Sequence, residues 1–158
     1  MPEKTSKWFK LRNLKRSQWA VILQSPWVLF LTSMRLHRSG YQKTLDHINH
    51  LSASVVPVDI QAKVARETAF ALSVAIRLVP WGPRCLTRSL ALAWLLKRRG
   101  IPFVLRIGVP RGTTIAWEGK PVTLSAHAWV EHAGIVLNDR QDVALRFSAF
   151  DTGSGSAS

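Results

Sequence analysis

The chain has 158 residues, of which 47% are hydrophobic and 20% are charged, and its formal net charge is +13. This length and composition are those of one globular domain with a sizeable core and exclude a disordered chain. The single cysteine, Cys85, excludes an intramolecular disulfide and a zinc site built from several cysteines. Its thiol therefore serves either packing or chemistry.

The positive charge is spread along the chain. Basic residues recur over residues 4–16, and a triplet at 97–99 precedes Gly100, where a helix C-terminus favours cations. These charges either keep the protein soluble and stabilise helix ends, or attract an acidic peptide or an anionic membrane. Nucleic acid is not an expected partner, because the sequence holds no recognisable nucleic-acid-binding motif. We expect a cytoplasmic protein, since no cleavable signal peptide is visible at the N-terminus.

The first 36 residues form a basic arm, 1–16, and a largely apolar segment, 17–36. Gln24, Ser25 and Pro26 interrupt the apolar run, which leaves it short of the about twenty apolar residues that a bilayer span needs. We expect two short helices on either side of Pro26. These helices pack on the domain or contact the inner surface of a membrane.

Residues 37–60 predict a polar helix and then an extended connector. His47 and His50 lie three residues apart on this helix; we interpret them as surface residues and predict no metal site. Asp59 is expected to cap a helix over 60–79, in which apolar residues recur at steps of three and four. A turn over 80–83, rich in proline and glycine, ends that helix.

The next helix, over 85–99, is apolar nearly all round, which predicts burial on more than one side. Gly100 and Pro102 end it. Alternating residues predict a strand over 103–109, and two further strands are expected over 121–131 and 135–140. Helices followed by an antiparallel sheet indicate the α+β class. We divide the chain into a basic arm and helical region (1–58), a core of helices and strands (59–150) and a flexible tail (151–158).

Cys85 opens this buried helix, where the positive end of the helix macrodipole favours a thiolate. Arg84 and Arg88 add to this effect if they lie close. The alternative is that Cys85 is only a small buried apolar residue. His127 lies on the second predicted strand between two alanines, whose small side chains allow another element to approach closely.

Asp139 is expected to pair with His127 across a hairpin. Residues 132–134 predict a three-residue loop with Gly134 at the position of positive φ, and pairing Glu131 with Ile135 then places Asp139 opposite His127. A carboxylate there can hold one imidazole nitrogen while the other serves the thiol. A register slip of one residue would move Asp139 to the other face and make Asn138 the orienting residue.

Five stretches together resemble the stand-alone leader peptidases of lasso peptide biosynthesis, which belong to the transglutaminase-like, papain-related superfamily. They are RCLTRSLAL at 84–92, RRGIP at 98–102, IGV at 107–109, AHAWVE at 126–131 and LND at 137–139. The resemblance implies a catalytic helix packed on a small antiparallel sheet. Carried over by position, it implies that Cys85 is the nucleophile, His127 the general base and acid, and Asp139 the orienting residue.

The resemblance further implies that the enzyme hydrolyses the leader–core bond of a ribosomally made precursor before an asparagine-synthetase-like cyclase closes the macrolactam. Residues 1–80 lack the strands of a precursor-recognition domain, so we expect that domain as a separate partner chain. Trp81, Arg84, Arg88 and Trp129 are expected to line the peptide groove, and no cofactor is expected. Two alternatives stay open: acyl transfer to an amine, as in transglutaminases, and a non-catalytic basic adaptor that binds a peptide or a membrane.

Overall fold

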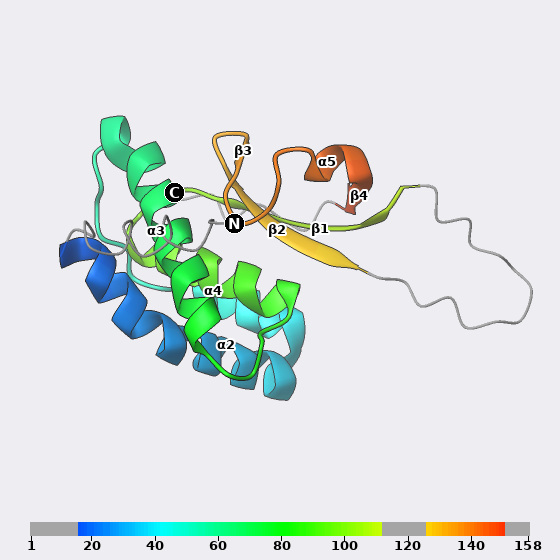
Figure 1. Ribbon diagram of the computed structural model, residues 1–158, viewed down its shortest axis with the longest axis horizontal. Helices are drawn as coiled ribbons and strands as arrows, with labels where there is room; N and C mark the ends of the chain where they lie inside the picture. The colour runs from blue at the N-terminus through cyan, green and yellow to red at the C-terminus, as the bar shows by residue number, and fades with distance from the viewer. Residues whose placement is uncertain (1–15, 112–125, 151–158) are drawn as a thin grey trace, which may run out of the picture.

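The computed structural model describes residues 16–111 and 126–150 and combines helices with one small sheet. The helices are α2 (Arg16–Asn49), α3 (Val58–Leu78), α4 (Cys85–Arg98) and the short α5 (Val143–Arg146). The strands β1 (Val104–Pro110), β2 (His127–His132), β3 (Ile135–Val136) and β4 (Phe147–Phe150) pair antiparallel in the order β3-β2-β1-β4. The three long helices gather on one side of this sheet (Figure 1). The predicted α+β class is confirmed.

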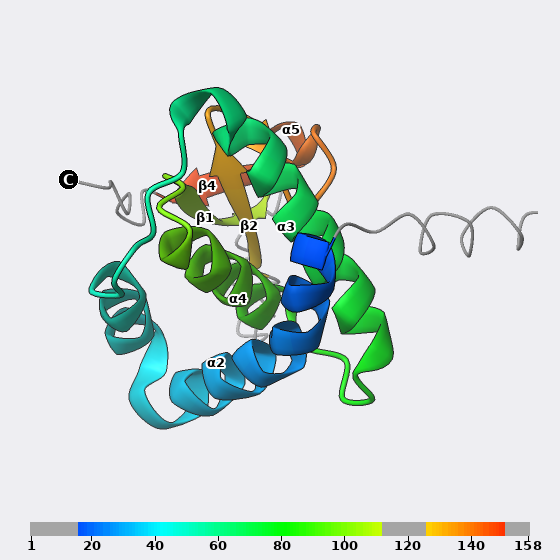
Figure 2. The ribbon, with the colours of Figure 1, turned by 90° about the vertical axis from the view of Figure 1, so that its left-hand side faces the viewer.

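The helix α4 lies between the other long helices and the sheet (Figure 2). Every residue from Ser89 to Leu96 is buried, which agrees with the apolar composition of the helix around its whole circumference. The chain leaves α4 through Gly100, whose φ is +64°. A Cβ atom at this position would lie 2.0 Å from the carbonyl oxygen of Ser54, so only glycine satisfies both the backbone and the neighbouring connector.

The predicted break at Pro26 is wrong. α2 continues through Pro26 and departs from helical geometry instead at Gly40, where φ is 78° and ψ is 179°. A proline inside a helix removes one hydrogen bond. On both sides of Pro26, however, α2 buries apolar residues in the core, Val21 and Ile22 before it and Val28 and Leu29 after it. This packing outweighs the lost bond and keeps the segment helical.

The predicted helix over 60–79 is confirmed as α3, but its start was placed two residues late. α3 begins at Val58, and Pro57 occupies the N-cap without a side-chain hydrogen bond. Asp59 therefore does not cap the helix. It lies in the first turn, where its negative charge complements the helix macrodipole. The predicted boundary between 58 and 59 falls at the start of α3, and helices on both sides of it contribute to one core.

The strands confirm part of the prediction. β1 runs over Val104–Pro110, close to the predicted 103–109, and pairs with β2. β3 is only two residues long, because the chain bends away after Val136 instead of remaining extended to 140. Residues 121–125 of the predicted second strand, most of the basic arm and the predicted tail lie outside the described residues. Within the described part, no helix combines the length and the apolarity needed to cross a bilayer.

Candidate active site

Cys85 is the first residue of α4 and lies where the helix meets the sheet. Arg84 at the N-cap is extended and provides no side-chain cap. The first backbone N–H groups of α4 are therefore left without a side-chain acceptor. The Cys85 Sγ atom lies 3.9 Å from the carbonyl oxygen of Ala126, the residue before His127. The thiol is partly exposed, which keeps it accessible to a reactant.

Ser89 repeats this helix-to-strand contact one turn further along α4. Its hydroxyl is fully buried and donates a 2.8 Å hydrogen bond to the carbonyl oxygen of Ala128. Four residues of helix advance about 6 Å and two residues of strand advance about 6.6 Å, so the two elements stay in step. The predicted close approach beside the alanines is confirmed: two side chains of α4 reach backbone carbonyls of β2 and of the residue before it.

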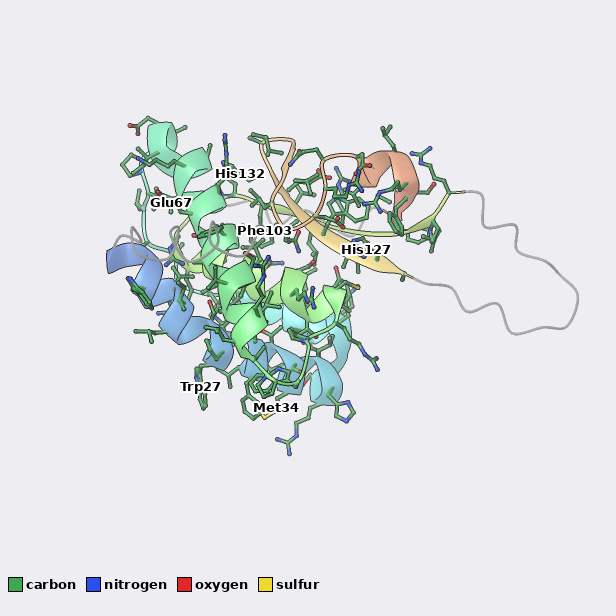
Figure 3. The ribbon with its side chains drawn as sticks, in the orientation of Figure 1. Trp27, Met34, Glu67, Phe103, His127 and His132 are labelled. Carbon is green, nitrogen blue, oxygen red and sulfur yellow. The ribbon has the colours of Figure 1, made fainter. Side chains whose placement is uncertain are left out.

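His127 projects from the start of β2 (Figure 3), and its Nε2 atom is hydrogen-bonded to Asp139 Oδ2. The imidazole is stacked on Phe147, with ring centroids 4.9 Å apart, and Trp129 lies on the same side of the strand at 6.2 Å. These contacts fix the plane of the ring. Because Nε2 is occupied by the carboxylate, Nδ1 is the nitrogen left for the thiol.

Asp139 is held in its ionised form by several donors. Its Oδ1 atom accepts a 2.6 Å hydrogen bond from the backbone N–H of Arg140, and the Arg146 guanidinium lies 3.5 Å away. Burial by itself raises the pKa of Asp139. The hydrogen bonds from His127 and Arg140, together with the positive charge of Arg146, outweigh burial and hold the pKa of this carboxyl below its ordinary value.

His127 and Asp139 meet, although the hairpin between them was predicted wrongly. The loop has two residues, Ala133 and Gly134, both at positive φ, and the register pairs Glu131 with Val136. This is the one-residue slip that, in a continued strand, would have turned Asp139 away from His127. The strand does not continue: the chain bends after Val136, and the bend returns Asp139 to the His127 ring.

The Asn138 side chain binds the edge of β2 at the point where β3 has ended and no longer pairs with it. The backbone N–H of Val130 donates a 2.8 Å bond to Asn138 Oδ1, and Asn138 Nδ2 donates a 2.8 Å bond to Ser89 Oγ. Asn138 therefore does not orient His127. It joins β2 to α4, and its side chain replaces the strand backbone that would otherwise have paired there. Its partner Ser89 was not singled out from the sequence, although its position four residues after Cys85 places it on the same helix face.

The four predicted substrate-binding residues do not lie in one place. Trp81 and Arg84 line a cavity of about 800 Å³ together with the α2 residues Phe30 and His37. Arg88 lines a different cavity, of about 960 Å³, which lies between α3 and residues 135–141 and which Asp139 also borders.

Trp129 is only 1% exposed, and its indole N–H donates to Glu131, so the structure shows it packed beside His127. Contact of all four residues with substrate stays a prediction. The burial of Trp129 does not favour such a contact for this residue. Within residues 16–111 and 126–150, no three side chains of metal-binding type gather into a cluster.

Comparison with protein families identifies the superfamily to which this chain belongs. Residues 28–151, which include all three residues of the site, match the family model of the transglutaminase-like superfamily. Neither the search of curated proteins nor the search of solved structures gave a match. The match covers most of the chain, from the middle of α2 through β4. The chain therefore belongs to the transglutaminase-like superfamily.

Proposed function

We propose that the protein is a cysteine peptidase that removes the leader from a ribosomally made lasso precursor peptide. The observation that carries the proposal is the arrangement of Cys85, His127 and Asp139. The thiol lies at the uncapped N-terminus of α4 against the carbonyl of Ala126, the residue before His127, and the His127 imidazole is held by an ionised carboxylate. Membership of the superfamily supports cysteine-based acyl chemistry, and the sequence resemblance supports a leader peptide as the substrate.

The first step is attack of the Cys85 sulfur on the carbonyl carbon at the leader–core junction. His127 Nδ1 takes the thiol proton, and the sulfur must turn from the Ala126 carbonyl oxygen toward this nitrogen. The carbonyl oxygen becomes negatively charged. The backbone N–H of Cys85, at the helix N-terminus, is the first donor available to it. Asp139 stabilises the imidazolium that forms.

The second step releases both products. His127 donates its proton to the amine of the core peptide as the C–N bond breaks, which leaves the leader as a thioester on Cys85. His127 then takes a proton from a water molecule, which attacks the thioester and regenerates the thiol. The products are a leader carboxylate and a core peptide with a free amine. A cyclase of the asparagine-synthetase type would use that amine to close the macrolactam.

We expect a separate precursor-recognition protein to bind the leader peptide and to present it to the active site. The described part of residues 1–80 is helical and holds no strand that could form a recognition domain. We therefore expect efficient cleavage only when this partner is present. The partner lowers the entropic cost of bringing the junction to Cys85.

The test is to incubate the protein with the precursor and its recognition partner and to follow leader and core peptide by mass spectrometry. Cys85→Ala should lower the cleavage rate by about a thousandfold or more while leaving the fold intact by circular dichroism. Because Cys85 is the only cysteine, the variant is also the blank for labelling with iodoacetamide. Cleavage by folded Cys85→Ala at the rate of the unmodified protein would refute the peptidase.

A small primary amine added to the same reaction separates hydrolysis from acyl transfer. Hydrolysis yields a leader that ends in a carboxylate even with the amine present. A leader that ends in an amide would show that the acyl-enzyme prefers an amine, which is the transglutaminase alternative. The mass difference between the two products identifies the acceptor directly.

A further inference from the structure

The outer face of α2 is apolar over four turns. Large apolar side chains recur along it at helical spacing and stay exposed: Trp19 (46%), Leu23 (75%), Trp27 (64%), Phe30 (47%) and Met34 (37%). We call these five residues the α2 stripe. Figure 3 shows Trp27 and Met34 at the outer edge of the molecule, directed away from the core. The indole of Trp27 and the ring of Phe30 lie 5.9 Å apart, so the stripe is continuous there.

The outer face of α2 lacks the charged residues of an ordinary surface helix over 17–34. Between Arg16 and Arg35 the sequence holds no charged residue. Two of its hydroxyl residues, Ser25 and Thr32, lie on the inner side and are fully buried, whereas Ser33 is exposed beside Met34. A surface helix normally turns a polar face to water. A continuous exposed apolar face of this kind marks an interaction site.

The charges at the borders of the stripe indicate the kind of surface it meets. From residue 16 to residue 45 the charged side chains are all basic, namely Arg16, Arg35, Arg38 and Lys43. The first carboxylate after them is Asp46. The surrounding chain has the same sign, with a net charge of +13. An apolar strip whose flanking charges along the helix sequence are all basic is complementary to an anionic surface that has an apolar layer beneath it.

We propose that the α2 stripe docks the protein on an anionic membrane, with α2 lying in the plane of the interface. The stripe projects from a convex helix, and a fluid lipid layer accepts such a ridge without a preformed groove. From residue 19 to residue 34 the ridge extends about 22 Å, enough to lie along the surface. Tryptophan is favoured at the boundary between headgroups and acyl chains. Tryptophan, phenylalanine and leucine are typical of the apolar face of helices that lie in this boundary. This inference does not depend on the proposed peptidase activity.

Docking by this face sets the orientation of the rest of the molecule. Phe30 belongs to the stripe and also lines the cavity of about 800 Å³ that Trp81 and Arg84 border. Arg84 is the N-cap of α4 and precedes Cys85. A protein held on lipid through the stripe therefore keeps this cavity, and the start of α4, close to the membrane surface.

The test measures sedimentation of the full-length protein with lipid vesicles. Vesicles of phosphatidylcholine with phosphatidylglycerol are compared with vesicles of phosphatidylcholine alone, at low and high salt. We expect binding to the anionic vesicles that weakens as salt is raised. Leu23→Ser should lower the partition coefficient by about tenfold, because the side chain no longer enters the apolar layer.

Leu145→Ser is the matched control, because Leu145 on α5 is as exposed as Leu23 (78% against 75%) but lies outside the stripe. It should bind vesicles as the unmodified protein does. Equal loss in both variants, or no binding of the unmodified protein to anionic vesicles, would overturn the proposal. So would a dimer in solution that Leu23→Ser converts to a monomer, since a second copy would then cover the stripe. Leader cleavage without vesicles, measured in parallel, should be equal in both variants.

Discussion

Removing the Ser89 hydroxyl tests whether the contact between α4 and β2 holds the candidate site together. Ser89→Ala deletes one oxygen atom at a fully buried position and leaves the helix propensity of the position favourable. The deletion takes the hydrogen-bond donor from the Ala128 carbonyl and the acceptor from Asn138 Nδ2. Asn138 is partly open to solvent and can turn to water, whereas the carbonyl loses its partner inside the helix–strand contact.

Loss of a partner for a buried polar group costs about 1–3 kcal/mol, so we expect the free energy of unfolding to fall by about 2 kcal/mol. In a domain of this size, that change lowers the melting temperature by about 4–8 °C. Circular dichroism during thermal and urea unfolding measures both quantities. We also expect Cys85 to react with iodoacetamide at a changed rate, because Ser89 fixes α4 one turn from the thiol.

Ser25→Ala is the matched control for this experiment. Ser25 is equally buried, but its hydroxyl bonds to the Val21 carbonyl within α2, an acceptor that the helix backbone already uses. We expect a loss below about 1 kcal/mol for this variant and no change in the labelling of Cys85. If Ser89→Ala and Ser25→Ala lose equal stability and label alike, the hydroxyl of Ser89 does not hold α4 against β2.

Two further variants test the site and the fold. Asp139→Asn should lower the cleavage rate by about a thousandfold, since the amide does not stabilise an imidazolium as a carboxylate does. Because the pKa of Asp139 is lowered on folding, its stabilisation is complete above about pH 4 and is lost as the pH falls through the lowered value. The gap in unfolding free energy between the two proteins should therefore narrow in acid, and a constant gap would contradict the ionic role. Gly100→Ala should cost more than about 2 kcal/mol, because the new Cβ meets the Ser54 carbonyl at positive φ. Gly82→Ala is the control, because Gly82 also has a positive φ (+48°) but open space around it, and it should cost only about 1 kcal/mol. Equal melting temperatures of the two variants would contradict the clash at Gly100.

The sequence predicted those parts of the fold in which local pattern and tertiary packing agree. α3 and α4 follow from apolar spacing and from the glycine and proline residues that end them. The break expected at Pro26 failed because local propensity favours it, while burial of α2 on both sides of the proline opposes it. Packing of this kind involves residues distant in sequence, so a local reading does not detect it.

The hairpin shows a second limit. The sequence predicts a three-residue loop with Gly134 at the position of positive φ, whereas in the structure Ala133 also has a positive φ, of 48°, which is uncommon for alanine. The contact between His127 and Asp139 was predicted from a register that the structure does not have. It exists because the chain bends after Val136, whereas the sequence predicts an extended strand as far as residue 140.

The matched spacing of α4 and β2 also makes the site sensitive to insertions and deletions. Adding or removing one residue between Cys85 and Ser89 rotates the start of α4 by about 100° relative to the rest of the helix. Ser89 would still meet Ala128, but the sulfur would no longer lie against the carbonyl of Ala126, the residue before His127. We therefore expect the interval of four residues to be constant among active homologues, while the types of residue within it can vary.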